Sequence, residues 1–238
     1  MDDRDQFQFN RFPTPARPLL GVTILAVEDS RFACEAMRLL CVRSGARIRR
    51  ADSIMAAKRH LMVYRPTVLI VDHGLPDGEG ADLIHEAATI SPRIPVILGT
   101  SADDLAQDCC LAAGADGFLP KPTRSLAQFQ ELILACLPAE QRPMGPRAVN
   151  DEVIQPDTLA YQDDLAHAAD LLSDGNDDQI LDYVAQFVTG IARSAADGPL
   201  ITAGEALTIA RMQGRSCGSA VANLAGLMQD RLASPVAV

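Results

Sequence analysis

The segment from Val68 to Asp72 constrains the fold more than any other stretch of the chain. Four apolar residues, three of them β-branched, run directly into a single carboxylate, and a Leu-Pro turn with glycines follows. An unbroken apolar run of this length is typical of a strand that is buried on both faces of a parallel sheet. Open α/β sheets bind their ligands at the carboxyl ends of such strands. Taken alone, Asp72 fits the role of a turn-capping residue as well as that of a ligand-binding residue. The residues at the other strand ends are needed to distinguish the two roles.

Three further segments place polar side chains at the ends of predicted strands. One strand ends in two carboxylates, one in hydroxyls and one in a lysine between prolines, namely Glu28 and Asp29, Thr100 and Ser101, and Lys121. At one edge of a sheet these groups would surround Asp72. Carboxylate oxygens suit a hard cation such as Mg²⁺, which typically uses few carboxylates and keeps several waters. A phosphoryl group on Asp72 would then meet the metal, Lys121 and Thr100, and phosphoryl transfer relies mainly on such positioning and charge stabilisation.

In this order and at this spacing, the residues resemble the receiver domain of two-component response regulators, over residues 21–137. The resemblance implies a flavodoxin-like domain in which Asp72 is the phosphoacceptor. It implies a magnesium site made by Glu28, Asp29, Asp72 and the backbone carbonyl of Gly74. The implied partner is a sensor histidine kinase or a phosphotransfer protein, and the implied cofactor is Mg²⁺.

The resemblance also assigns roles to three residues near the predicted acceptor. Lys121 would pair with the phosphoryl group, and the bond that joins it to Pro122 would be cis, which is affordable only before proline. Thr100 would be the switch hydroxyl, and Phe118 would be the aromatic switch residue three positions before the lysine. A simple packing role is the alternative for Phe118.

The order of predicted elements fixes the fold class of this part. Strand and helix alternate five times, which indicates an α/β fold with a doubly wound, five-stranded parallel sheet and helices on both faces. The charged segment 46–51 is a weak strand that suits an edge of the sheet. Ser101, with Asp104 three residues later, predicts a capping box for the fourth helix.

Charge separates the two ends of the chain. Residues 1–150 carry 17 Lys+Arg and 18 Asp+Glu, whereas residues 151–238 carry 4 Arg and 13 Asp+Glu, so nearly all of the net charge of −10 lies in the C-terminal part. Because DNA binding depends on Lys and Arg that neutralise phosphates, this part is a poor candidate for a DNA-binding module.

Composition also divides the chain into segments. Residues 1–20 are polar and then rich in proline, which indicates a mobile tail, with Phe7, Phe9 and Phe12 as candidates for docking on a surface. Residues 138–156 contain four prolines and predict a linker between the domain at 21–137 and a helical domain at 157–238.

The C-terminal domain is predicted to be all-α. Asp157 and Asp177 can cap two helices, and Thr202 with Glu205 forms a capping box for a third. The apolar residues of the third helix keep a heptad-like phase, so it either continues for about 30 residues or breaks near Gly214. Short helices with few aromatic residues bury little surface alone, which favours a homodimer formed by pairing two such domains.

A phosphotransfer module is the alternative for this domain. Such modules carry an exposed histidine on a helical bundle, and His167 is the histidine of the C-terminal part. The lysine and glycine expected soon after that histidine are missing, since Ala168 and Ala169 follow it. Helix-turn-helix, cyclase and phosphate-loop signatures are also absent, so a catalytic or transcriptional output is less favoured than a protein-contact output.

These observations define one expected function. We expect a cytoplasmic phosphoacceptor switch that acts through protein contacts or dimerisation of its helical domain, and no enzyme beyond its own phosphorylation and dephosphorylation. The six cysteines form no Cys-x-x-Cys pair, which suits a reducing cytosol. The apolar runs are too short to span a membrane, and the N-terminal residues lack the pattern of an export signal.

Overall fold

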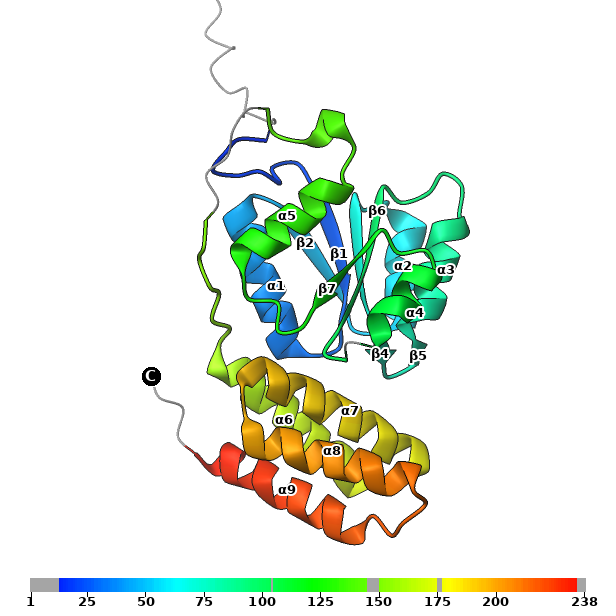
Figure 1. The fold of residues 1–238 in the computed structure, drawn as a ribbon, viewed down its shortest axis with the longest axis vertical. Helices are drawn as coiled ribbons and strands as arrows, with labels where there is room; N and C mark the ends of the chain where they lie inside the picture. Colours follow the sequence, from blue (N-terminus) through cyan, green and yellow to red (C-terminus); the bar gives the residue numbers. More distant parts are fainter. Residues whose placement is uncertain (1–12, 104, 145–149, 175–176, 235–238) are drawn as a thin grey trace, which may run out of the picture.

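A five-stranded parallel sheet organises the first half of the chain (Figure 1). The computed structural model describes residues 13–234 apart from 104, 145–149 and 175–176. The sheet order is β2-β1-β3-β6-β7 among these residues, so the predicted fold class is confirmed and the charged second strand is at an edge. The strands are β1 (Thr23–Val27), β2 (Arg47–Ala51), β3 (Val68–Asp72), β6 (Val96–Ser101) and β7 (Gly117–Pro120).

Alternate side chains of the central strands pack into two separate hydrophobic cores. Ile24 and Ala26 of β1 pack with helices α1 and α5, whereas Leu25 and Val27 pack on the opposite face with α2, α3 and α4. Both faces of the sheet are therefore covered, as the unbroken apolar run in β3 predicts. The helices are α1 (Arg31–Ser44), α2 (Ile54–Val63), α3 (Gly80–Thr89), α4 (Ala106–Ala112) and α5 (Leu126–Cys136).

A small hairpin extends the carboxyl end of β3. Its strands β4 (Gly74–Leu75) and β5 (Gly78–Glu79) pair antiparallel and lead directly into α3. In Figure 1 the hairpin lies at the edge of the sheet that faces the C-terminal helices. The chain therefore stays at this edge for several residues after the predicted acceptor, Asp72.

Four helices follow in the described part of the C-terminal region and pack as a bundle beyond the carboxyl edge of the sheet (Figure 1). Leu165, Val184, Leu207 and Leu224 are fully buried in its core. Phe32, which belongs to α1, is also part of that core, so the bundle is built onto the first domain. The helices are α6 (Thr158–Asp174), α7 (Asp178–Ala195), α8 (Gly198–Met212) and α9 (Gly218–Ala233).

The ends of these helices settle two sequence interpretations. The long third helix is broken, because α8 ends at Met212 and Gly214 adopts a left-handed φ of 61°. The predicted capping box at Thr202 is wrong. The cap is Asp197, whose side chain accepts a hydrogen bond from Leu200 N, and Pro199 follows in the first turn. Aspartate at the cap with proline just inside the helix is the stronger start signal.

The capping box predicted for the fourth helix is also wrong. Helix α4 begins at Ala106, five residues after Ser101, and its cap residue Leu105 makes no side-chain hydrogen bond. The Ser101 hydroxyl instead accepts a hydrogen bond from Asp103 N within the preceding loop. Asp104 lies outside the described residues.

The two segments predicted to be irregular are partly anchored. Leu19, near the end of the N-terminal tail, is fully buried in the core between the sheet and α1. In the linker, Val153 forms an isolated bridge with Ser125, and Ile154 is buried against the same core. Phe7, Phe9 and Phe12 lie outside the described residues. Among the described helices, none has the length and apolar character needed to cross a bilayer.

Candidate functional site

Three carboxylates meet where β1 and β3 end. Glu28 and Asp29 directly follow β1, and Asp72 is the last residue of β3, which pairs with β1 in parallel. One carboxylate oxygen from each of these residues lies within 4.8 Å of the other two. Glu28 and Asp72 are buried, with 0% and 7% of their surface exposed. The sequence prediction that these residues converge at one edge of the sheet therefore corresponds to the observed geometry.

Lys121 reaches the same cluster from the loop after β7. Its Nζ lies 3.0 Å from Asp72 Oδ1 and 2.8 Å from Glu28 Oε2, and its side chain is only 10% exposed. The backbone N–H of Lys121 donates to the carbonyl of Ser101 at 2.9 Å, which fixes this loop to the end of β6. The Lys121–Pro122 bond is cis, as the resemblance implies.

The charges in the cluster do not balance, because three carboxylates face one ammonium. Burial, followed by the neighbouring charge of Glu28, raises the pKa of Asp29 to about 7, although the hydrogen bond from Tyr183 opposes this shift. Burial also raises the pKa of Asp72 well above its usual range, although Lys121 opposes this effect. Asp29 and Asp72 are therefore harder to ionise than ordinary carboxyl groups unless an additional positive charge enters the cluster.

A divalent hard cation would neutralise the excess negative charge of the cluster. The donors are carboxylate oxygens close enough to share one ion, and Mg²⁺ prefers oxygen ligands of this kind. The backbone of Gly74, the fourth predicted ligand, lies at the start of β4, two residues beyond Asp72. A cation would replace the protons that the cluster otherwise binds. The residues present thus fit the predicted cofactor.

Thr100 and Phe118, the two predicted switch residues, lie on the neighbouring strands β6 and β7. Thr100 pairs with Asp72 in the sheet register, and its Oγ1 donates to the carbonyl of Leu119 at 2.7 Å. The hydroxyl is therefore turned toward β7. Phe118 is partly buried against the core formed with α2, α3 and α4, and its ring stands over Gly99, where an added Cβ would lie 3.3 Å from Cδ2.

The helical bundle contributes residues that the sequence analysis did not identify. Tyr183 of α7 donates its hydroxyl to Asp29 Oδ2 at 2.6 Å. Burial, followed by the charge of Asp29, raises the pKa of Tyr183, so the phenol remains a donor. Gln186, one turn further along α7, packs against Gly74 so closely that an added Cβ would lie 2.0 Å from Nε2. No motif marks these residues, because they lie more than a hundred positions from the carboxylates.

Helix α6 is tied to the same edge. Asp164 is 2% exposed, and its Oδ2 accepts hydrogen bonds from Ser30 Oγ at 2.7 Å and from Phe32 N at 3.0 Å. Its Oδ1 accepts one from Arg31 N at 2.8 Å. An acidic residue of one domain therefore satisfies the free N–H groups at the start of α1 in the other.

A cavity of about 620 Å³ lies between the acidic cluster and the bundle. Asp72 and Lys121 line it from the sheet, while Tyr183, Gln186 and Arg193 line it from α7. Arg193 spans the boundary, since Nη1 donates to the carbonyl of Ala102 at 2.5 Å and Nη2 pairs with Glu205 at 2.9 Å. The predicted acceptor therefore opens into a space that the bundle partly covers.

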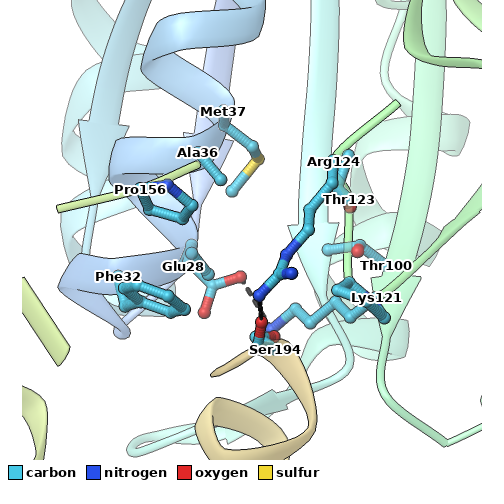
Figure 2. A pocket seen from close by; sticks show the side chains of 12 residues that line it. Glu28, Phe32, Ala36, Met37, Thr100, Lys121, Thr123, Arg124, Pro156 and Ser194 are labelled. Carbon is cyan, nitrogen blue, oxygen red and sulfur yellow. Dashed lines mark hydrogen bonds and ion pairs between the residues drawn. The ribbon is translucent and has the colours of Figure 1, made fainter. Parts of the chain in front are cut away.

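A further contact joins the first domain to α7 beside Lys121 (Figure 2). The guanidinium of Arg124 donates to the backbone carbonyl of Ser194. Figure 2 shows Arg124 passing between Met37 and Thr100, with Glu28 and Lys121 beside its tip. This contact anchors the end of α7 close to the buried ion pair.

His167, the residue of the alternative phosphotransfer prediction, lies on the exposed side of α6. Its ring meets the edge of Phe187 with centroids 6.0 Å apart. It does not line the cavity around Asp72.

Comparison with known proteins identifies the first domain. The model of the response regulator receiver domain matches residues 24–133. The chain is 28% identical over 99 residues to a protein of Escherichia coli named "KDP operon transcriptional regulatory protein KdpE". It is 33% identical over 106 residues to one of Mycobacterium tuberculosis named "Probable transcriptional regulatory protein TcrX". Each alignment covers 42% of this chain and 44% of the relative, so the chain matches less than half the length of these relatives.

Among solved structures, one neighbour is the receiver domain of a sensor histidine kinase from Pseudomonas aeruginosa PAO1, which is described with a magnesium ion coordinated in its active-site cleft. The sequence identity is 25% and the TM-score is 0.44. The match covers 48% of this chain and 95% of the neighbour.

Proposed function

Residues 24–133 are a response regulator receiver domain, and from this premise we propose that the protein is a phosphoacceptor switch that uses Asp72. A histidine kinase or a phosphotransfer protein would donate the phosphoryl group. The observation that supports this proposal most directly is the convergence of Asp72, Glu28 and Asp29, with buried Lys121 paired to the first two.

The proposed reaction is an in-line displacement at phosphorus. An oxygen of Asp72 forms the new O–P bond while the P–N bond to the donor imidazole breaks, and the imidazole leaves with the electron pair. Lys121 offsets the charge on the acceptor, since its Nζ lies 3.0 Å from Asp72 Oδ1. Glu28, Asp29, Asp72 and the Gly74 carbonyl would hold Mg²⁺, which when bound supplies charge neutralisation for the phosphoryl oxygens.

Thr100 and Phe118 would carry the change away from the acceptor. The Thr100 hydroxyl, now donating to Leu119, would turn to the new phosphoryl oxygens. The space that it leaves near β7 would let Phe118 repack against the surrounding core. We propose a switch rather than an enzyme that acts on another substrate.

The helical bundle is the proposed output element. It touches the acidic cluster through Tyr183 and the start of α1 through Asp164, so a new charge on Asp72 would act beside the surface on which the bundle docks. The relatives named above are described as transcriptional regulators, but residues 151–238, which include the bundle, have 4 Arg against 13 acidic residues, which opposes direct DNA binding. We therefore propose signalling through protein contacts.

Dimerisation through the C-terminal helices is a second form of this output. Leu165, Val184 and Leu224 are already fully buried within one chain, so a dimer would add to the bundle core and is not needed to complete it. Light scattering with and without Mg²⁺ and beryllofluoride distinguishes the two forms. A mass that changes with the mimic makes assembly the output, whereas a constant mass leaves the bundle contacts as the output.

The acceptor assignment is tested by labelling. Incubation with phosphoramidate and Mg²⁺ should add one phosphoryl group to the intact protein, detected by mass spectrometry, and Asp72→Asn should abolish it. Retained labelling in that variant would refute the assignment. Replacing Glu28 and Asp29 together with alanine should remove the dependence of labelling on Mg²⁺.

A further inference from the structure

Tyr183 makes a direct hydrogen bond from the bundle to the acidic cluster. Its hydroxyl donates to Asp29 Oδ2 at 2.6 Å. The two residues are separated by 154 positions in the sequence. The bond therefore exists only when α7 is docked on the receiver domain.

The tyrosine is held in place from both sides. Its ring stacks on Phe187, with centroids 5.6 Å apart and an interplanar angle of 24°. Gln186 packs on Gly74, and Arg193 donates to the carbonyl of Ala102, so α7 contacts both the hairpin and the loop after β6. A donor held this firmly can orient the carboxylate that it contacts.

The bond leaves room for a metal on the same carboxylate. An ionised carboxylate accepts about four hydrogen bonds or ligands, and Tyr183 uses one of these positions on Oδ2. Groups that hydrogen-bond to a ligating carboxylate orient it for the metal, and their loss typically lowers metal affinity by about 10–100-fold. By fixing the orientation of the Asp29 carboxylate, Tyr183 would favour a metal that uses the remaining positions of that carboxylate.

We propose that Tyr183 is a positioning residue for the metal ligand Asp29, so that magnesium binding and docking of the helical bundle strengthen each other. This inference rests on the proposed function, because it takes the carboxylate cluster to be a magnesium site. By thermodynamic linkage, the bundle increases the affinity for Mg²⁺ by the same factor by which Mg²⁺ stabilises the docked bundle.

Magnesium titration of the full chain by calorimetry tests the first half of the linkage. Tyr183→Phe removes only the hydroxyl and should weaken Mg²⁺ binding by about 10–100-fold. Tyr161→Phe is the matched control, because it removes a hydroxyl of the same bundle that donates to Asp197 at 3.1 Å. The control should retain the wild-type affinity.

Hydrogen exchange in the unphosphorylated protein tests the second half. The amides of Arg31 and Phe32 donate to Asp164 of the bundle, so their exchange reports docking. Mg²⁺ should slow their exchange in the wild type and in Tyr161→Phe, and should do so much less in Tyr183→Phe. This measurement on the wild type remains decisive if the Tyr183 variant does not fold.

The outcomes separate this inference from the proposed function. A wild-type protein that does not bind Mg²⁺ overturns the metal site and the inference together. A wild type that binds Mg²⁺ while Tyr183→Phe binds it equally well or more tightly overturns the inference alone. Exchange at Arg31 and Phe32 that is insensitive to Mg²⁺ in the wild type also overturns the linkage.

Discussion

Asp164 of α6 accepts a hydrogen bond from the hydroxyl of Ser30, the residue that caps α1, at 2.7 Å. Through this bond and those from Arg31 N and Phe32 N, the bundle completes the N-terminus of a helix in the other domain. The start of α1 directly follows Glu28 and Asp29 in the chain. The docking of the bundle and the geometry of the acidic cluster therefore depend on the same few residues.

Replacing Asp164 with alanine should loosen the bundle. The change leaves the Ser30 hydroxyl and two backbone N–H groups without their protein acceptor, which should cost about 1–3 kcal/mol of unfolding free energy. Denaturant unfolding measures this loss, and hydrogen exchange at Arg31 and Phe32 should become faster.

Asp163→Ala is the matched control for that experiment. Asp163 is the preceding residue and pairs with Arg31 at 2.7 Å, but both side chains are more than half exposed. An exposed pair of this kind contributes less than about 1 kcal/mol. Equal destabilisation by both changes would show that the buried contacts of Asp164 carry no special weight.

Thr100→Val should allow phosphoryl labelling of Asp72 but block the conformational response to it. Valine has a similar shape but lacks the hydroxyl that donates to Leu119, so the loss of that bond costs about 1 kcal/mol of stability. Asp72, Lys121 and the metal ligands remain, so the protein should still be labelled by phosphoramidate. In the valine variant, Mg²⁺ and beryllofluoride should no longer change hydrogen exchange at the bundle contacts. Thr100→Ser should restore that change. A full response in the valine variant would remove Thr100 from the switch.

The acidic cluster was predictable from the sequence because its parts are local. Asp72 and the Glu28-Asp29 pair each follow an apolar strand, and the ends of parallel strands converge by topology alone. The contact between Tyr183 and Asp29 was not predictable, because it depends on how two separately built cores dock. Nothing in the spacing of α7 distinguishes Tyr183 from an ordinary surface residue.

The first residues of the helices show a second limit of prediction from sequence. Thr202 and Glu205 match a capping box, yet α8 begins at Gly198 behind Asp197. Two start signals lay a few residues apart, and the one with Pro199 in its first turn prevailed since proline is pre-organised for that position. Local patterns therefore indicated that a helix begins here, but not which signal the packing would select.

Stability without metal should depend on pH through Asp29. Its pKa is raised from an ordinary value of 3.8 to about 7, chiefly by burial, so the folded state binds a proton more tightly than the unfolded state. Between these two values the unfolded chain has released that proton and the folded one retains it, so stability falls as the pH rises from about 4 to about 7. Denaturant unfolding in EDTA at several pH values measures this slope.

Asp29→Asn should reduce the slope of that profile, because the amide does not titrate, while the remaining slope comes from Asp72, whose pKa is also raised by burial. Mg²⁺ should have a similar effect in the wild type, because it compensates the ionised carboxylate and gains affinity as the pH rises. A wild-type profile that is already flat between pH 4 and 7 in EDTA would contradict the assignment of this proton to Asp29.

Two glycines beside the acceptor should respond differently to alanine. At Gly80 an added Cβ would lie 1.9 Å from the backbone oxygen of Asp72, and the backbone of β3 cannot move without shifting the acceptor. Gly80→Ala should therefore cost about 2–4 kcal/mol of unfolding free energy and reduce labelling of Asp72.

At Gly74 the added Cβ would meet Nε2 of Gln186, the end of a flexible side chain that can swing away. Gly74→Ala should cost less than about 1 kcal/mol, and Gln186→Ala in the same chain should remove that cost. Denaturant unfolding of the three variants tests this prediction. A Gly74 variant as unstable as the Gly80 variant would show that α7 is packed too rigidly on the hairpin for Gln186 to move aside.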